Sequence, residues 1–212
     1  MIPSWSLIIT AGCLAVFSAV NLHNILRYHD RPTKGASEPE VPVPQGFTVG
    51  LVALGTGAFF LESLLYLLLG VLNRELSQLP ILDLPFTESD PFEFAGALIM
   101  TLGYAIFIWS VIARGRYATS WTMPPEQQLV DWGPYRYVRH PSYLGYFLMF
   151  IGFFLMWSNV LSLIPLAAIP EYYRVTIREE EMLVKRFGDR YLQYRQKAGR
   201  FLPRIRLHRS QT

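Results

Sequence analysis

The stretch from Gly133 to Gly145 gathers side chains that could hold a charged ligand. It places tyrosine, arginine and histidine where a polar, basic segment meets a long apolar one. Pro141 fits the first turn of a helix, where its missing N–H costs nothing. His140 then lies at the helix N-terminus, where unpaired backbone N–H groups can bind an anion such as a ligand carboxylate. A neutral imidazole there would donate one hydrogen bond and accept another.

A second group of ionisable residues consists of Arg174 and the run Glu179, Glu180 and Glu181. By composition alone, such a run is usually a solvated helix face. It could equally hold a positively charged ligand. We expect Arg174, near the end of an apolar segment, to pair with one of these glutamates or to bind a substrate carboxylate with its forked guanidinium.

Aromatic side chains accompany both groups. Tyr135, Tyr143 and Trp121 would either wall a pocket or form the belt of Tyr and Trp found at membrane surfaces. Arg139 likewise suits either a site or a lipid-phosphate contact. The single cysteine and the four scattered histidines lack the spacing of metal ligands, so we expect no metal site.

Long apolar blocks must position these residues. The chain is 51% hydrophobic and only 17% charged, whereas soluble domains are about a quarter charged. We therefore expect an all-α polytopic membrane protein with about five transmembrane helices. The expected spans are residues 3–26, 46–72 and 92–113, followed by a C-terminal helical hairpin with arms at 141–157 and 160–176.

Three features of these blocks have structural consequences. Glu62 lies at mid-membrane depth in the second span, where it either fixes helix packing through a buried hydrogen bond or handles a proton or substrate. Pro165 and Pro170 predict kinks or a break in the second hairpin arm. Residues 177–197 predict an amphipathic helix lying on the membrane face.

The hairpin makes a geometric prediction. Its arms are antiparallel and meet at Ser158-Asn159, so Pro141 and Thr176 must lie at the same membrane depth. His140 and the glutamate run are thereby expected to meet at one face, together with the loop 121–132.

Lys and Arg predict the orientation. Of the 19 in the chain, three lie in 27–45, one in 73–91, four in 114–140 and eleven from 174 onward. With five alternating spans, all but one fall on a single face, which the positive-inside rule assigns to the cytoplasm, with the N-terminus outside. The basic balance therefore indicates membrane orientation and no nucleic-acid partner.

Motifs in the second half resemble one known family. RHPSYLG at 139–145, EExxLxxxFG from Glu179 to Gly188, and the C-terminal Phe201-Leu202-Pro203 resemble the isoprenylcysteine carboxyl methyltransferases. These are integral-membrane enzymes that use S-adenosylmethionine. Gln128-Leu129-Val130 with Gly133-Pro134-Tyr135 is similar to that family's cofactor loop. The resemblance covers 115–205.

The apolar pattern predicts three N-terminal transmembrane helices in 1–113. The resemblance implies a catalytic methyltransferase region in 114–212, with its cofactor loop, hairpin and C-terminal helix. The cofactor pocket would face the cytoplasm, closed by the C-terminal helix. A lipophilic acceptor, such as an isoprenylcysteine-like carboxylate, would enter from the bilayer near Trp121 and Arg174. Arg174 and Glu179 would be catalytic. The implied cofactor contacts are Gln128, Leu129, Val130, Tyr135, His140, Pro141, Tyr143, Glu179 and Glu180.

Methyl transfer also suits the chemistry of the residues. An in-line displacement at a sulfonium methyl needs no metal, and a carboxylate acceptor needs no general base, so positioning in a water-poor pocket would suffice. Two alternatives stay open: a sterol-reductase-like membrane reductase that uses NADPH, and a non-enzymatic membrane scaffold. The acceptor (lipid amine, thiol, prenylcysteine carboxylate or another apolar molecule) and the oligomeric state are not determined by the sequence.

Overall fold

The computed structural model describes residues 2–28, 46–73, 84, 90–117 and 127–204. Within these residues the fold is all-α, as predicted, and contains six α-helices. They are α1 Ser4–Tyr28, α2 Phe47–Val71, α3 Asp90–Arg114, α4 Pro141–Met156, α5 Leu163–Phe187 and α6 Asp189–Lys197, with the short 3-10 turns η4 Gly115–Tyr117 and η5 Gly133–Arg136.

Three of the described helices, α1, α2 and α3, are long and apolar enough to cross a membrane, and α4 is a shorter apolar helix. Apolar side chains cover the outside of the bundle. Ile8, Leu61 and Val71 are 72%, 69% and 77% exposed, which suits hydrocarbon far better than water. The chain is an integral membrane protein.

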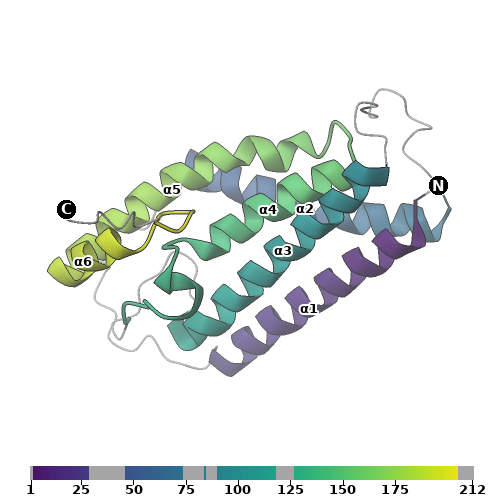
Figure 1. The fold of residues 1–212 in the computed structure, drawn as a ribbon. Coiled ribbons are helices and arrows are strands. Elements are labelled where there is room, and N and C mark those ends of the chain that lie inside the picture. The colour runs from purple at the N-terminus through teal and green to yellow at the C-terminus, as the bar shows by residue number, and fades with distance from the viewer. Residues whose placement is uncertain (1, 29–45, 74–83, 85–89, 118–126, 205–212) are drawn as a thin grey trace, which may run out of the picture.

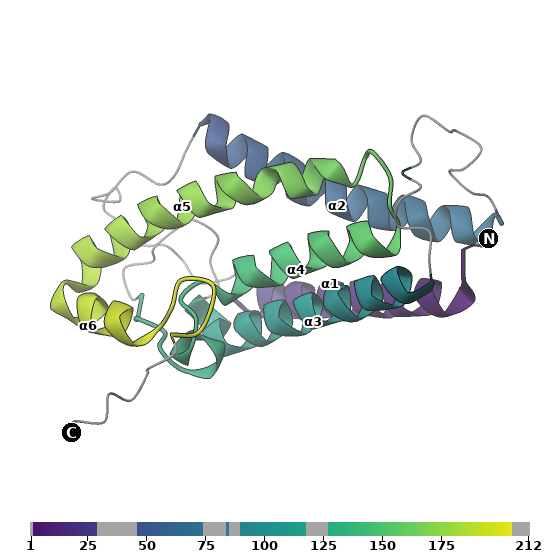
Figure 2. The ribbon, with the colours of Figure 1, turned by 45° about the horizontal axis from the view of Figure 1, so that its top comes forward.

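The helices α1 to α5 run side by side and alternate in direction (Figures 1 and 2). The N-terminus, the end of α2 and the α4–α5 turn lie at one end of the bundle. The end of α1, the start of α2, the end of α3, the start of α4 and the helix α6 lie at the other. We call this second end, formed by residues 114–117, 127–140 and 177–204, the site end.

Glycines let α3 and α4 pack with their backbones in contact. A Cβ atom on Gly103 would lie 2.7 Å from the Gly145 carbonyl oxygen, and one on Gly152 would lie 2.6 Å from the Gly96 carbonyl oxygen. Both helices therefore need small residues along this seam. The seam fixes the start of α4, and with it His140, against the end of α3.

Replacing Gly103 by leucine should destabilise the protein by about 3 kcal/mol, because the added atoms would meet backbone that cannot rotate away. Circular dichroism of the purified protein in detergent during heating would measure the loss. Gly12→Leu on α1 is a matched control, since a Cβ there meets nothing within 4 Å. Equal melting temperatures for the two variants would contradict the seam.

The hairpin turn is confirmed at Ser158-Asn159 and is closed by its own side chains. The Asn159 Oδ1 accepts from the Ser162 N–H at 3.1 Å, and the Ser162 hydroxyl donates to the Asn159 carbonyl at 2.7 Å. Both residues are buried. The turn therefore needs no solvent to satisfy its polar groups.

Of the kinks or break expected at Pro165 and Pro170, the break does not occur, because Pro165 lies in the first turn of α5, where its missing N–H costs nothing, and the helix continues through Pro170. The expected end of the second arm is wrong. No boundary occurs near Thr176 either. The helix ends at Gly188, whose φ of 52° favours glycine, so the amphipathic segment predicted at 177–197 is the last part of α5 followed by α6.

Candidate active site

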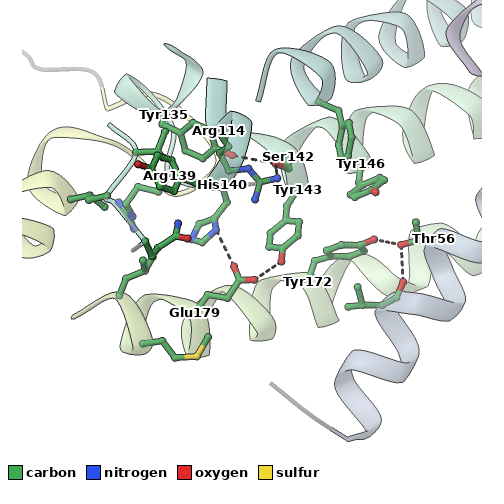
Figure 3. Close-up of a pocket in the computed structure, with 18 of the residues that line it drawn as sticks. Thr56, Arg114, Tyr135, Arg139, His140, Ser142, Tyr143, Tyr146, Tyr172 and Glu179 are labelled. Atoms are coloured by element: carbon green, nitrogen blue, oxygen red, sulfur yellow. Dashed lines mark hydrogen bonds and ion pairs between the residues drawn. The ribbon is translucent and has the colours of Figure 1, made fainter. Parts of the chain in front are cut away.

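A cavity of about 500 Å³ opens inside the site end of the bundle (Figure 3). One end is polar and the other is apolar, and hydroxyl groups and one arginine lie between them. The polar end is lined by Gln127, Gln128, Leu129, Val130, Arg139, His140, Glu179, Tyr191 and Tyr194. The middle is lined by Arg114, Tyr135, Ser142, Tyr143, Tyr146, Tyr172 and Thr56, and the apolar end by Val52, Ala53, Gly57, Phe60 and Phe107.

The two ends of the hairpin that lie away from its turn, at His140 and at Glu179, meet in the polar end of the cavity, as the antiparallel arms predict. We call them the histidine foot and the glutamate foot. The His140 Nδ1 lies 3.4 Å from Glu179 Oε2, and the Tyr143 hydroxyl donates to Glu179 Oε1 at 2.5 Å. Figure 3 shows the Glu179 carboxylate between the imidazole and the phenol. Glu179 thus keeps a fixed position on the cavity wall while remaining partly exposed to the cavity.

Glu180 has a different position and different partners. It is 4% exposed, does not line the cavity, and accepts hydrogen bonds from three cations. Its Oε1 lies 2.9 Å from Arg139 Nη2 and 3.2 Å from His140 Nε2, and Arg200 Nη2 donates to its Oε2 at 3.1 Å. Because its lone pairs are used in this way, Glu180 anchors the wall of the cavity, and Glu179 is the glutamate that faces the cavity.

The strap, residues 198–201, crosses the front of α4 and is held by backbone hydrogen bonds. The Gly199 carbonyl accepts from the Arg139 N–H at 2.7 Å, and the Arg200 carbonyl accepts from the His140 N–H at 3.1 Å. A Cβ on Gly199 would lie 1.7 Å from the Leu202 carbonyl oxygen, so only glycine fits there. The strap therefore fixes the backbone on both sides of His140.

Aromatic contacts complete this closure. The Phe201 ring lies 5.1 Å from that of Phe147 and 6.0 Å from the imidazole of His140. The Tyr194 hydroxyl donates to the Tyr135 carbonyl at 2.7 Å, which docks α6 onto η5. The C-terminal Phe-Leu-Pro motif thus lies beside the site.

The charges of this cluster shift two pKa values in opposite directions. Burial disfavours a charged His140, but its hydrogen bonds to Glu179 and Glu180 and their negative charge outweigh burial and raise its pKa. Burial also disfavours a charged Glu180, yet hydrogen bonds from His140 and Arg200 and the charge of Arg139 lower its pKa to about 2. His140 therefore differs from the neutral imidazole expected at a helix N-terminus: both its nitrogens face carboxylates and favour the imidazolium.

These shifts predict a pH window for the stability of the site end. Because the pKa of His140 is higher in the folded protein than its ordinary value of 6.5, the charged imidazole stabilises the fold fully at pH values below 6.5. This stabilisation is lost as the pH rises through the folded-state pKa. Because the pKa of Glu180 is lower in the folded protein than its ordinary value of 4.5, the ionised carboxylate stabilises the fold fully at pH values above 4.5. This stabilisation is lost as the pH falls toward 2. Hydrogen exchange of the strap amides should be slowest between these limits.

The loss of strap-amide protection at alkaline pH tests the role of His140 most directly. In a His140→Gln variant the strap should no longer lose protection as pH rises above neutrality, after correction for the intrinsic exchange rate. An unchanged alkaline limb in this variant would contradict the assignment to His140.

Arg114 lies in the middle of the cavity with an unused donor. Its Nη2 donates to the Ser142 hydroxyl at 3.2 Å, and its guanidinium carbon lies 6.0 Å from the Tyr135 ring centre. Its Nε is buried and has no hydrogen-bond partner, and within the described residues no carboxylate forms an ion pair with it. A half-buried guanidinium in this position can bind an anionic group of a ligand.

Several predicted site residues lie where the resemblance implies and others do not. Leu129 and Val130 are buried in the cavity wall, Gln128 lines it but is largely exposed, and Pro141 begins α4 without lining the cavity. Trp121 lies outside the described residues.

The pairing predicted for Arg174 is wrong. Arg174 pairs with Glu171 one turn earlier on α5, its side chain is 65% exposed, and it does not line the cavity. The reason is helical periodicity. Tyr172, Val175 and Glu179 share the inner face of α5, and Arg174 lies on the outer one.

Sequence reasoning missed Arg114, Thr56 and Tyr172. The Thr56 and Tyr172 hydroxyls are hydrogen-bonded to each other and join α2 to α5 (Figure 3). No spacing in the sequence links these residues, because the contact depends on helix packing. Glu62, which the sequence singled out, is 4% exposed and lies outside the cavity lining, and neither of its carboxyl oxygens has a hydrogen-bond partner among the residues that the structure describes.

The polar end suits a nucleoside-containing ligand. Among the described residues, the buried Gln127 Oε1 has no hydrogen-bond partner, and Gln127 lines the cavity. Tyr191 lines the cavity as well, and its hydroxyl lies near Arg139. Buried polar atoms without partners are costly and mark where a ligand can supply them. Together with the Glu179 carboxylate and the apolar Leu129 side chain, they match the mixed polar and flat apolar character of S-adenosylmethionine.

The site and fold thus define a membrane protein with a buried cavity that joins a charged end to an apolar one. Comparison with known proteins gives a family that part of the chain matches. Residues 92–190 match the family model described as phospholipid methyltransferase. This segment includes α3, α4, most of the cavity wall and both feet of the hairpin.

Named relatives agree with that match. The protein-S-isoprenylcysteine O-methyltransferase of Schizosaccharomyces pombe is 40% identical over 80 residues, which are 36% of this chain and 34% of that protein. The human enzyme of the same name is 36% identical over 80 residues, 37% of this chain and 28% of that protein. A probable enzyme of this name from Oryza sativa subsp. indica is 28% identical over 117 residues, 53% of this chain and 61% of that protein.

Residues 92–190 of this chain are thus similar to the phospholipid methyltransferase family, and the resemblance to the isoprenylcysteine carboxyl methyltransferases is confirmed. Methyltransferases of this family use S-adenosylmethionine. The chain spans about a third of the length of the first fungal relative.

Proposed function

We propose that this protein is an integral-membrane, S-adenosylmethionine-dependent methyltransferase that acts on a lipophilic acceptor bearing a carboxylate. The observation that carries the proposal is the single cavity of about 500 Å³, with His140 and Glu179 at its polar end and α2 side chains at its apolar end. A donor nucleoside and a lipid chain can thus approach one another without crossing water.

The proposal includes the arrangement in the membrane. Residues 1–113 would supply three spans, and α4 with the first part of α5 would supply the fourth and fifth. Residues 114–212 would form the catalytic region. The basic site end would face the cytoplasm, since it carries most Lys and Arg side chains.

The polar end would bind the methyl donor. Glu179, held by Tyr143, presents a carboxylate to the donor's positive groups or its ribose hydroxyls, and Leu129 and Val130 form an apolar wall beside Tyr135. His140 and Arg139 place positive charge at the start of α4, where the donor's carboxylate would be bound. Glu180 has a positioning role, since it holds these cations in place from behind.

Arg114 replaces Arg174 as the residue proposed to hold the acceptor. Its unused Nε–H and its place between the polar and apolar ends would orient a carboxylate toward the donor. Bound S-adenosylmethionine would supply a methyl group on a sulfonium sulfur, which a carboxylate oxygen would accept to give a methyl ester, with S-adenosylhomocysteine as the leaving product. The residues hold the acceptor oxygen in line and exclude water, and the reaction requires no proton transfer.

A direct experiment incubates the purified protein with radiolabelled S-adenosylmethionine and either N-acetyl-S-farnesylcysteine or an extract of whole membrane lipids. We expect a base-labile methyl ester. A label that resists mild base would point to an amine or thiol acceptor and overturn the carboxylate. Saturable NADPH binding without S-adenosylmethionine binding would instead favour a reductase, and binding of neither would favour a scaffold.

A further inference from the structure

We infer that two buried serines, Ser110 of α3 and Ser142 of α4, form a hydrogen-bond chain that holds the guanidinium of Arg114 in position for the acceptor. The inference rests on the proposed function, in which Arg114 binds the acceptor's carboxylate. It gives both serines a positioning role: they act through Arg114, and neither binds the acceptor itself.

The direction of the hydrogen-bond chain follows from the number of hydrogens available. The Ser110 hydroxyl donates to the Phe107 carbonyl at 2.7 Å, and its oxygen lies 2.7 Å from the hydroxyl oxygen of Ser142. A serine hydroxyl has one hydrogen and two lone pairs, and a carbonyl has no hydrogen to give. Both short contacts are hydrogen bonds at the same time only if Ser142 donates to Ser110.

The lone pairs of the Ser142 oxygen are used by two donors. Arg114 Nη2 donates to it at 3.2 Å, and the Tyr135 hydroxyl lies 3.4 Å from it. Because the single hydrogen of Ser142 is given to Ser110, both of these groups must donate. Arg114, Tyr135 and Ser142 lie close together in Figure 3. Ser142 therefore lines the cavity with its hydrogen-bonding capacity already taken.

Helix packing fixes the distance between the two serines. Ser110 is fully buried and Ser142 is buried, so water cannot replace either partner. One helical turn from this contact, a Cβ on Gly145 would lie 2.9 Å from the Cβ of Phe107. The seam between α3 and α4 is thus tight where the serines meet, and the same seam that positions His140 also positions the partner of Arg114.

Arg114 is a side chain that such an anchor can make more effective. An arginine is long and flexible, and fixing it costs conformational entropy. Within the described residues no carboxylate forms an ion pair with Arg114, and its guanidinium is held by the Ser142 hydroxyl and lies over the Tyr135 ring. A guanidinium fixed before the acceptor arrives loses less freedom on binding, and the acceptor binds more tightly.

The experiment removes the serine that does not line the cavity. Ser110→Ala should lower kcat/KM for N-acetyl-S-farnesylcysteine about fivefold, with the Kd for S-adenosylmethionine unchanged, because Ser110 can affect the acceptor only through Ser142 and Arg114. Ser63→Ala is the matched control, since Ser63 is equally buried, donates to the Phe59 carbonyl at 2.8 Å and lies outside the cavity lining. Equal kcat/KM values for the two variants would overturn the inference.

A double-mutant cycle distinguishes positioning from a general loss of packing. In an Arg114→Met background, Ser110→Ala should change kcat/KM by less than about twofold, because the group through which Ser110 acts is gone. A second fivefold loss in that background would overturn the inference. Ser142→Ala should lower kcat/KM at least as much as Ser110→Ala does, since it removes the direct partner of Arg114, and a smaller loss would overturn the order of the chain.

A readout without turnover separates this inference from the proposed function. Equilibrium binding of tritiated N-acetyl-S-farnesylcysteine to the same variants requires no methyl transfer. If Ser110→Ala weakens this binding and Ser63→Ala does not, but the wild type forms no methyl ester, the proposed function fails and the positioning role stands. If the ester forms and the two variants bind and react equally well, the inference fails alone. A wild type that neither binds this compound nor forms an ester from it or from membrane lipids would overturn both.

Discussion

A Glu180→Gln variant is expected to lose S-adenosylmethionine binding and to be destabilised by about 3–5 kcal/mol. The carboxylate of Glu180 is the common partner of Arg139, His140 and Arg200. An amide would remove the negative charge shared by the three cations, and only His140 would keep a carboxylate partner, Glu179. The strap would detach, and the start of α4 would lose its fixed position.

Thermal unfolding in detergent and equilibrium binding of radiolabelled S-adenosylmethionine measure the two effects. Glu181→Gln is the control, because Glu181 is the next residue on α5 and is exposed. Wild-type binding and stability in the Glu180→Gln variant would show that the cation cluster does not hold the site together.

An Arg114→Met variant is expected to lose about a hundredfold in kcat/KM for the carboxylate acceptor, while its Kd for S-adenosylmethionine stays at the wild-type value. Arg114 lies in the middle of the cavity, beyond the residues of the polar end, and has one buried N–H without an acceptor. Methionine keeps the length of the side chain but removes its charge and its hydrogen bonds.

Two further variants sharpen this result. Arg114→Lys should recover part of the activity, since it keeps the charge but not the forked geometry. Arg116→Met, which changes an exposed arginine that lies over the Tyr117 ring at 4.7 Å, should behave as wild type. A parallel loss of donor binding in Arg114→Met would mean that Arg114 shapes the whole cavity instead of binding the acceptor.

The meeting of His140 with Glu179 could be predicted from the sequence because it depends only on the order of apolar segments. Two antiparallel arms of similar length must return the chain to the depth from which it started. The approximate bounds of the first three helices followed from the same apolar pattern. None of these inferences needed to know which helix packs against which.

The middle of the cavity could not be predicted for the opposite reason. Arg114 and Thr56 lie on helices that approach the site only through packing against α4 and α5. Arg174 was misplaced although its position could have been inferred: on a helix it lies opposite the face shared by Tyr172 and Glu179. The different positions of Glu179 and Glu180 could not be predicted either, because they depend on where Arg139 and Arg200 lie in the folded protein.

The most direct test of the account is equilibrium binding of radiolabelled S-adenosylmethionine to the purified wild type and to Glu179→Gln. The account predicts saturable binding by the wild type and a Kd raised about tenfold or more in the variant, with the melting temperature preserved because Glu179, unlike Glu180, is not the anchor of the cation cluster. An identical Kd in the two proteins would contradict the claim that the glutamate foot and the histidine foot of the hairpin share the methyl donor.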